Sequence, residues 1–420
     1  MRTNEPNRIE LLAPAGNFEK LEMVLHYGAD AVYLAGKDFS LRNFSGNFSL
    51  DEIEAAVGLA HAYGARAYVA VNIYARPGDL AAIERYIHQL KALTPDGLIA
   101  ADPAIVAMIR RVAPDIPLHL STQANTTNDA AVRFWKAQGV RRVNAARELS
   151  LAEIAQLAAV PGMEIEAFIH GAMCISYSGR CLLSNYMAHR PSNQGMCCQP
   201  CRFQYAVMEE TRPGQYFPLA EDDQGTYIFN SRDLCMLEHL PSMIGSGICA
   251  LKIEGRMKGI HYAATAVKIY REAIDAYRAD PAGYAPRPYW SEELNKITSR
   301  GYCTGFYLGD PNQAAPALIP LRPHLHVLAG KVLSSAGRNK AYIEVRNRIR
   351  QGDWVEIVKP KGPGIPARIL SITDNEGEPV AMAHPAARAT VALTSDCQRF
   401  DLLRLDPSAE TTDSEALDKV

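Results

Sequence analysis

The sequence has no long apolar run and little net charge, and each of these absences excludes a class of protein. No stretch approaches the ~20 apolar residues that span a bilayer, so we expect no transmembrane helix and no membrane partner. The first residues lack the apolar core of a secretory signal peptide, which predicts a soluble, cytoplasmic protein. The formal net charge is -2, whereas proteins that bind nucleic acid over a broad surface are usually basic. Any contact with nucleic acid should therefore depend on local patches.

Two common catalytic motifs are also missing. The sequence contains neither the HExxH helix of zinc proteases nor the GxSxG turn of serine hydrolases. A dyad of Cys174 and His170 stays open as a peptidase alternative, but a nucleophile needs a base that a third group orients. The residues therefore offer little support for hydrolysis of peptides.

Short apolar runs alternate with amphipathic segments through the first part of the chain. The expected strands begin at Ile9, Ala31, Arg66, Gly97, Ile116, Val140, Glu164 and Ala250. Eight strands with helical crossovers over roughly 250 residues are typical of a TIM-barrel-like (β/α)8 domain of the α/β class. A doubly wound sheet is the alternative. Its one GxGxxA match, at residues 245–250, precedes a strand instead of following it, so it does not predict a dinucleotide site.

Composition divides the chain into three parts. Residues 1–320 form the expected barrel domain, with a cysteine-bearing insertion at about residues 172–227. Loops of that length inside a compact domain are usually functional. Residues 321–405 contain short strand-like runs separated by turn residues, which predict a small C-terminal β-barrel. The polar, acidic residues 406–420 are expected to be a disordered tail.

Five of the nine cysteines lie between positions 174 and 201. Disulfides are rare in cytosolic proteins, so this clustering predicts metal or redox chemistry. The candidate ligands are Cys174, Cys181, Cys197 and Cys201, with six residues between the first two and three between the last two. The wide first spacing favours a [4Fe–4S] cluster, and structural zinc stays the alternative. Cys198 and Cys235 are substitute ligands, although adjacent cysteines rarely both reach one metal.

The segment around the first two cysteines resembles a known family signature. Residues 166–184 read EAFIHGAMCISYSGRCLLS, which is similar to the signature of peptidase family U32, the collagenase-like group. The stretches ELLAPAGN, GADAVYLAG and LKIEGRMK also resemble this family, so the likeness extends over about residues 9–308. Within the family, LHLSTQAN, RELSLAEI and GTYIFNSRDL are most similar to the tRNA hydroxylation protein P group.

This resemblance implies an activity, a cofactor and partners. The activity is formation of 5-hydroxyuridine at the wobble position of tRNA, with prephenate as the hydroxyl source. Relatives that hydroxylate ubiquinone precursors carry a [4Fe–4S] cluster, and their pattern maps onto Cys174, Cys181 and Cys197. Cys201 is the expected fourth ligand, Cys235 is held in reserve, and Cys198 is a bystander. Proteins that deliver the cluster are further expected partners; the oligomeric state is not predicted.

Polar residues follow the expected strands where a TIM barrel carries its chemistry, at the C-terminal ends. The expected catalytic residues are His170, Glu254 and Arg147, and the expected substrate-binding residues are Arg42, Asn72, Gln123, Asn125 and Arg256. Arginine forks pair with carboxylates, which suits the two carboxylates of prephenate. His170 would transfer a proton near neutral pH, and Glu254 would act as a base or orient Arg256. A structural ion pair or loop cap is the alternative for each.

Two groups of residues are candidates for contact with tRNA. Arg346, Arg348 and Arg350 would share one face of a strand and could meet phosphates, or could form an ordinary solvated face. The aromatic candidates in the insertion are Tyr177, Tyr186 and Phe203. Such rings can stack an unpaired base, but we expect them to pack in the core.

Overall fold

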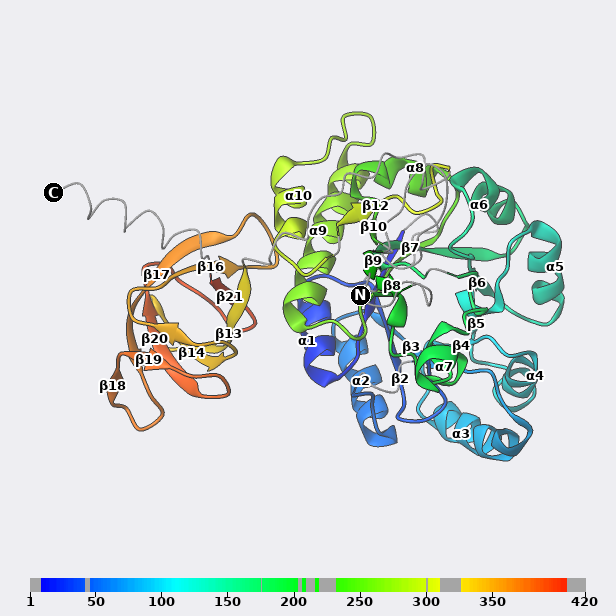
Figure 1. Ribbon diagram of the computed structural model, residues 1–420, viewed down its shortest axis with the longest axis horizontal. Helices are drawn as coiled ribbons and strands as arrows, with labels where there is room; N and C mark the ends of the chain where they lie inside the picture. Colours follow the sequence, from blue (N-terminus) through cyan, green and yellow to red (C-terminus); the bar gives the residue numbers. More distant parts are fainter. Residues whose placement is uncertain are drawn as a thin grey trace.

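Eight parallel strands close into a barrel in the larger domain of the computed structural model (Figure 1). They are β1 (Glu10–Pro14), β2 (Ala31–Ala35), β3 (Arg66–Val71), β4 (Gly97–Ala100), β5 (Leu118–Leu120), β6 (Arg142–Asn144), β7 (Glu164–Ala172) and β11 (Ala250–Ile253). Strand β11 pairs in parallel with both β1 and β7, which closes the ring. The TIM-barrel-like prediction is therefore confirmed, and the doubly wound sheet is excluded.

The structure describes residues 9–41, 46–174, 176–202, 206–208, 216–218, 232–299, 301–309 and 326–405. Several expectations fall outside these ranges: Arg42, Phe203, the boundary between residues 320 and 321, and the tail 406–420. Much of the insertion beyond residue 202 also lies outside them. Among the described helices, none is both long and apolar enough to cross a membrane.

Helices between the strands cover the outside of the barrel (Figure 1). They are α1 (Phe18–His26), α2 (Leu50–Ala62), α3 (Leu80–Ala92), α4 (Pro103–Val112), α5 (Asp129–Ala137), α6 (Leu151–Ala158), α8 (Leu240–Gly245) and α9 (Ile260–Ala279). Local sequence explains where some begin. Ser49 with Glu52, and Ser150 with Glu153, form capping boxes that satisfy the first backbone N–H groups of α2 and α6. Each helix connects one parallel strand to the next. The C-terminal ends of all eight strands therefore lie on the same rim of the barrel.

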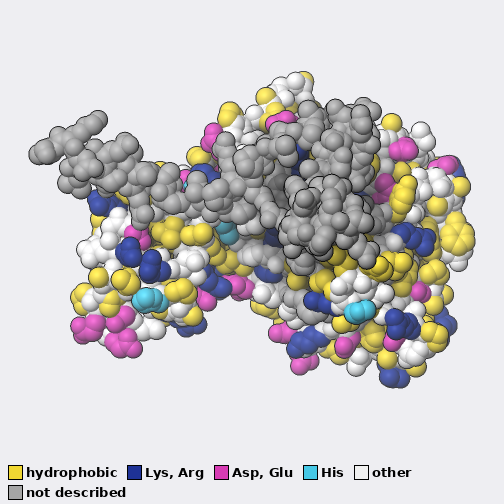
Figure 2. Space-filling view, in the orientation of Figure 1, with side chains coloured by type: hydrophobic (Ala, Val, Ile, Leu, Met, Phe, Trp, Pro, Cys, Tyr) yellow, Lys and Arg dark blue, Asp and Glu magenta, His cyan; other side chains and the backbone are white. Residues whose placement is uncertain are grey.

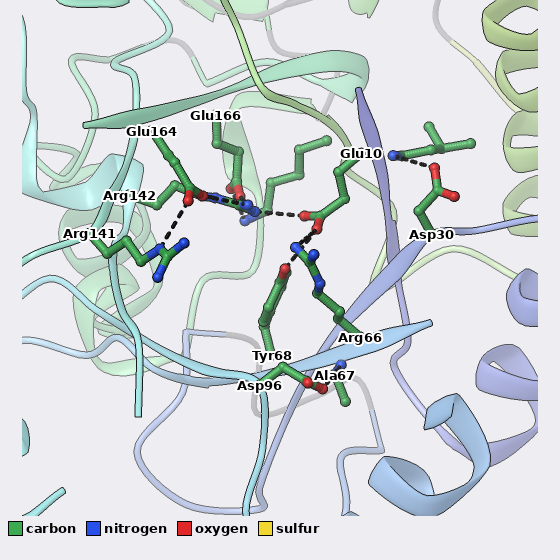
Figure 3. Close-up of polar contacts among 12 residues, drawn as sticks. Glu10, Asp30, Arg66, Ala67, Tyr68, Asp96, Arg141, Arg142, Glu164 and Glu166 are labelled. Carbon is green, nitrogen blue, oxygen red and sulfur yellow. Dashed lines mark hydrogen bonds and ion pairs between the residues drawn. The ribbon is translucent and has the colours of Figure 1, made fainter. Parts of the chain in front are cut away.

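Charged side chains fill the barrel near the N-terminal ends of its strands (Figure 3). Arg142 donates to Glu10 at 2.6 Å and to Glu164 at 2.8 Å. Glu10 also accepts a hydrogen bond from Tyr68 at 2.8 Å and pairs with Arg66 at 3.0 Å. A buried charge is tolerated only when it is paired and hydrogen-bonded, and this network meets that requirement. No sequence pattern predicted this network.

Two short strands extend the sheet beyond the closed ring. Strand β10 (Asp233–Cys235) pairs antiparallel with the C-terminal end of β7, and β12 (Tyr302–Cys303) pairs with β10. This edge brings residue 235 opposite His170. The chain that carries the cysteines therefore leaves the barrel at the end of β7 and returns beside it.

The C-terminal domain is a closed antiparallel barrel. Its strands are β13 (Val327–Ser335), β14 (Lys340–Val345), β16 (Trp354–Val358), β17 (Ile365–Thr373), β20 (Arg388–Leu393) and β21 (Leu402–Leu405). They follow the order β16-β21-β13-β14-β20-β17, and pairing of β16 with β17 closes the ring. Apolar residues alternate along most of these strands and form a core of their own. The predicted β-barrel is therefore present.

Buried charges join the two domains. The fully buried Arg404 of β21 donates to Glu293 of α10 (Pro288–Asn295) at 2.5 Å and to Glu356 of β16 at 2.6 Å. The Tyr27 hydroxyl at the end of α1 donates to the Val358 carbonyl at 2.8 Å. Figure 1 shows the small barrel against α1, α9 and α10. Breaking these contacts would leave buried groups unpaired, so the domains form one packed unit.

The basic run at residues 346–350 does not form the strand face that its spacing indicated. Strand β14 ends at Val345, and β15 (Ile349–Arg350) belongs to a separate two-stranded sheet. Arg346 pairs with Glu19 of α1 across the domain interface. The expectation of a single phosphate-binding face of three arginines is therefore wrong.

Candidate active site

A pocket opens at the C-terminal ends of the barrel strands, where the fold places catalytic groups. Five residues expected from the sequence line it: Asn72, Gln123, Arg147, Glu254 and Arg256. They come from the loops after β3, β5, β6 and β11. Residues far apart in the sequence thus converge because parallel strands end at one rim.

Arg147 lies almost fully buried in this pocket. Its guanidinium stacks on the Phe168 ring at 4.1 Å, and its Nη1 contacts Cys174 Sγ at 3.0 Å. Its Nε has no hydrogen-bond partner among the described residues. A buried donor without a partner is costly, so this side chain is suited to a ligand that supplies an acceptor.

Arg256 is a second buried cation of the pocket, and its orientation is fixed by hydrogen bonds. Its Nη2 donates to Asn47 at 2.7 Å, and its backbone carbonyl accepts from Lys20 at 2.9 Å. Burial, and then the nearby Arg256 charge, lower the pKa of Lys20. Glu254 is the one acidic residue of the described lining, against three cations, since Lys252 also lines the pocket. The pocket therefore favours an anionic ligand.

The remaining amides expected from the sequence have different surroundings. Asn72 bridges two loops, accepting from the Leu41 backbone and donating to Ser121 at 3.4 Å. Asn125 adopts a left-handed conformation, φ 52°, and donates to Glu148 at 2.6 Å. It is absent from the described lining of the pocket. Its hydrogen bond orients Glu148, so its role here is structural.

The first turn of the insertion packs against the rim of the pocket. Glu148 accepts hydrogen bonds from the backbone and the hydroxyl of Ser178, both at 2.9 Å. A Cβ at Gly179 would meet the Gln123 carbonyl at 2.2 Å, and the φ of Gly179 is +76°. Only glycine fits such a position, so the turn is held closely over Gln123.

His170 lies in the core and not in the pocket. Its ring contacts Tyr262 and Tyr270 of α9, and its Nδ1 lies 3.3 Å from the Tyr270 hydroxyl. Burial lowers its pKa to about 4, although Asp233 opposes the shift. The side chain is therefore neutral at pH 7 and has no access to a ligand in the pocket. Its placement does not support the expected catalytic proton transfer.

Burial of neutral His170 predicts a stability that depends on pH. Its folded pKa, about 4, lies below the unfolded value of 6.5, so the unfolded chain binds more protons in acid. The free energy of unfolding should fall as pH drops from 6.5, and His170 should account for about 2 kcal/mol by pH 5. Urea unfolding at pH 7 and pH 5 measures this loss. In His170→Phe the loss should shrink by that amount, and an unchanged loss would contradict the assignment.

The candidate ligand cysteines all carry free thiols. Cys174 is exposed at the rim of the pocket, whereas Cys181, Cys197 and Cys201 are half-buried. In the described part of the chain, no group of three or more Cys, His, Asp or Glu residues is placed to hold a metal ion. The thiols supply the right ligand chemistry for a cluster, but among the described residues they are not gathered around one point.

The two substitute ligands are also engaged elsewhere. The Cys198 backbone N–H donates to the Ser184 hydroxyl at 3.1 Å, and the same hydroxyl lies 3.3 Å from Cys198 Sγ. Burial raises the pKa of the Cys235 thiol, and its sulfur lies 3.5 Å from the Tyr270 hydroxyl.

Comparison with family models identifies most of the chain. The model of peptidase family U32 matches residues 16–316, and that of the U32 C-terminal domain matches residues 325–404. The chain belongs to peptidase family U32. The resemblance inferred from the signature around Cys174 is thus confirmed.

Curated relatives of this chain are named for different activities. "tRNA hydroxylation protein P1" of Bacillus subtilis is 42% identical over 379 residues, which cover 90% of each chain. "tRNA hydroxylation protein P" of Escherichia coli is 34% identical and covers 96% of this chain and 98% of its own. A "Collagenase" of Porphyromonas gingivalis is 30% identical over 72% of this chain and 74% of its own.

Sequence reasoning missed Lys252 and Asn144, which also line the pocket of this U32 protein. Both lie within strands, whereas the expected residues were sought beyond the strand ends. A lysine within the otherwise apolar strand ALKI was an available signal, because lysine is seldom buried without a partner.

The aromatic residues of the insertion contradict the expectation of core packing. Tyr177 is 68% exposed and Tyr186, on α7 (Leu183–Ala188), is 85% exposed. Tyr177 directly precedes the Ser178–Gly179 turn that packs on the pocket rim, whereas Tyr186 lies further along the insertion. They are therefore available to a large ligand.

Proposed function

We propose that this U32 protein is a tRNA-modifying enzyme that hydroxylates wobble uridine to 5-hydroxyuridine in the cytoplasm. The observation that carries the proposal is the 42% identity, over 90% of each chain, with a protein named for tRNA hydroxylation. A second relative with the same kind of name covers 98% of its own length. Similarity over both domains supports a shared activity more strongly than similarity of the barrel alone would.

Prephenate is the proposed hydroxyl source, and the charge of the pocket supports a substrate of this class. Three buried cations, Arg147, Lys252 and Arg256, share the lining with one carboxylate, Glu254. Arginine pairs with carboxylates through two parallel hydrogen bonds. Arg147 and Arg256 would hold the carboxylates and orient the substrate, while Glu254 would accept a proton or keep Arg256 in place.

Peptide hydrolysis, the activity named in the collagenase relative, receives less support from the site. A cysteine protease needs a thiolate and a neighbouring imidazole. Among the described residues, the pocket lining contains neither cysteine nor histidine. His170 is buried against α9, and the neighbour of Cys174 is Arg147. The two groups of the imagined dyad thus have other partners.

Contacts with tRNA should come from local groups. On the face in Figure 2, Lys and Arg side chains are scattered among acidic ones and do not form a single basic stripe. Tyr177, next to the Ser178–Gly179 turn on the pocket rim, and Tyr186 on α7 are exposed and could stack on unpaired bases of an anticodon loop. Tyr177→Ala should therefore weaken tRNA binding more than it weakens binding of a small substrate.

Nucleoside mass spectrometry of tRNA tests the proposed function. A strain that lacks this gene and any redundant pathway should lose 5-hydroxyuridine and its derivatives, and the full-length chain should restore them. Unchanged amounts in the deletion strain would refute the proposal. Cleavage of gelatin by the pure protein, lost in a pocket variant, would instead favour the peptidase alternative.

An iron–sulfur cluster remains a proposal that rests on the four cysteines of one segment and on the family resemblance. Protein purified without oxygen should then be brown and contain iron and sulfide. Cys174→Ala and Cys181→Ala should lose the iron, while Cys198→Ala should keep it and serves as the matched control. A colourless protein with stoichiometric zinc would contradict the cluster, and iron retained in all three variants would contradict the ligand set.

A further inference from the structure

Lys252 is a buried cation whose position within the barrel calls for an explanation. It lies in β11, is 4% exposed and lines the pocket. Inward-facing residues of a strand are two apart, so Lys252 lies one such position deeper than Glu254. Lysine is almost never buried this fully unless it is paired. The contacts of its ammonium group therefore indicate the role of this buried charge.

The ammonium of Lys252 has one hydrogen-bond acceptor among the described residues. Its Nζ lies 2.7 Å from Glu166 Oε1, and the Tyr33 ring lies 4.5 Å away on another side. An ammonium has three donors. One donates to Glu166, and the Tyr33 ring faces the charge from a second direction. At least one N–H is therefore available to a ligand in the pocket.

Glu166 is held from below by the charged network at the base of the barrel. Its second oxygen lies 3.6 Å from Nη1 of Arg142, which is itself bound to Glu10 and Glu164 (Figure 3). The Glu166 carboxylate thus lies between two cations, and it is 2% exposed. A carboxylate fixed in this way can hold the Lys252 ammonium at one place.

Asn144 supplies an independent indication of a ligand at this depth. It lies opposite Glu166 in the pairing of β6 with β7, is 3% exposed and lines the pocket. Its Oδ1 has no hydrogen-bond partner in the described part of the chain. An unpaired buried amide oxygen is costly, so a polar ligand that lets the Asn144 amide form a hydrogen bond would be favoured.

We propose that Lys252 and Asn144 bind a carboxylate of the ligand at the bottom of the pocket, and that Glu166 is a positioning residue for Lys252. This inference rests on the proposed function, in which the pocket takes a carboxylate substrate, and adds the residues that would recognise it. Lys252 Nζ donates to one carboxylate oxygen. The unpaired Asn144 Oδ1 is an acceptor and cannot bind a carboxylate, so the amide turns over and its Nδ2 donates to the carboxylate instead.

Binding of small dicarboxylates to the full-length protein tests this assignment without tRNA. Malonate and prephenate are the probes, and isothermal titration gives the dissociation constants. Lys252→Met alone would leave Glu166 unpaired and risks misfolding, so the double variant Lys252→Met/Glu166→Gln removes both charges together. We expect at least tenfold weaker binding in this variant and in Asn144→Leu. Arg141→Met, which removes an exposed charge from the same region of the barrel, is the control and should bind normally.

The role of Glu166 is tested by its own pair of variants. Glu166→Gln should weaken binding severalfold, and Glu166→Asp should recover part of that loss because it keeps the carboxylate. Equal losses in both variants would indicate a structural role and overturn the positioning assignment.

The two proposals fail in different ways. Unchanged affinity in the double variant, or no binding of either probe by the unmodified protein, overturns the carboxylate assignment whatever the tRNA result. Unchanged 5-hydroxyuridine in the deletion strain, with affinity lost in the double variant, refutes the tRNA function and leaves the carboxylate site standing.

Discussion

Replacing Arg147 by methionine should lower the proposed formation of 5-hydroxyuridine roughly ten- to a hundredfold. The guanidinium is buried in the pocket, stacks on Phe168 and has an Nε without a partner among the described residues. A hydrogen bond to a charged group contributes about 1.5–3 kcal/mol, and each 1.4 kcal/mol corresponds to about a tenfold change in an equilibrium constant. The measurement is the ratio of modified to unmodified wobble uridine in a deletion strain that expresses the variant at a low level.

Arg141→Met is the matched control for this experiment, because Arg141 is exposed and pairs with the partly exposed Glu164. It should leave the ratio unchanged. Arg147→Lys keeps the charge without the planar fork, so an intermediate ratio is expected. Full activity of Arg147→Met would contradict the assignment of Arg147 to the substrate-binding site.

Replacing Arg404 by methionine should destabilise the protein by about 3–5 kcal/mol, the range found when one partner of a buried ion pair is removed. Arg404 is fully buried between Glu293 and Glu356, so its loss leaves both carboxylates with fewer partners. Burial alone would raise the pKa of Glu293, but the hydrogen bond and charge of Arg404, together with the charges of Lys268 and Lys296, outweigh it and the pKa falls to about 2. Urea unfolding of the full-length chain at pH 7 measures the change.

The lowered pKa of Glu293 also determines how the stability of the protein changes in acid. Its contribution to stability is present above the unfolded value of 4.5 and is lost as pH falls towards 2. In Arg404→Met this loss should begin at a higher pH. Arg133→Met, which breaks an exposed pair with Asp129, should change stability by no more than about 0.5 kcal/mol. Equal effects of the two substitutions would show that the buried network is not stabilising.

The barrel was predictable because its signals are local. Each expected strand is a short apolar run, and each intervening segment has the period of a helix, so the count alone indicated the fold. The helix α10 was not expected, because residues 281–288 are rich in proline, which usually excludes a helix interior. Proline is tolerated in the first turn of a helix, and Pro288 stands there.

The site was predictable only in part. Which strand residues face the pocket depends on the register between neighbouring strands, and the sequence does not show that register. Strand alternation would place His170 on the same face as Phe168, inside the barrel. A register shift between Lys252 and Ile253 in the pairing of β11 with β7 breaks this alternation, and His170 contacts α9 instead. Lys252 and Asn144 were missed for the opposite reason, since they lie within strands and point inward. The amino-acid sequence alone does not show how far inside the barrel a strand residue lies.

The buried arginine between the domains has a consequence for any RNA that touches both of them. A C-terminal barrel held by Arg404, Glu293 and Glu356 cannot swing freely against α9 and α10. The distance between the surface of the C-terminal barrel and the open end of the large barrel is therefore fixed. An RNA that spans this spacing must bend or extend to match it, so the protein would select its partners by their shape before any base is recognised.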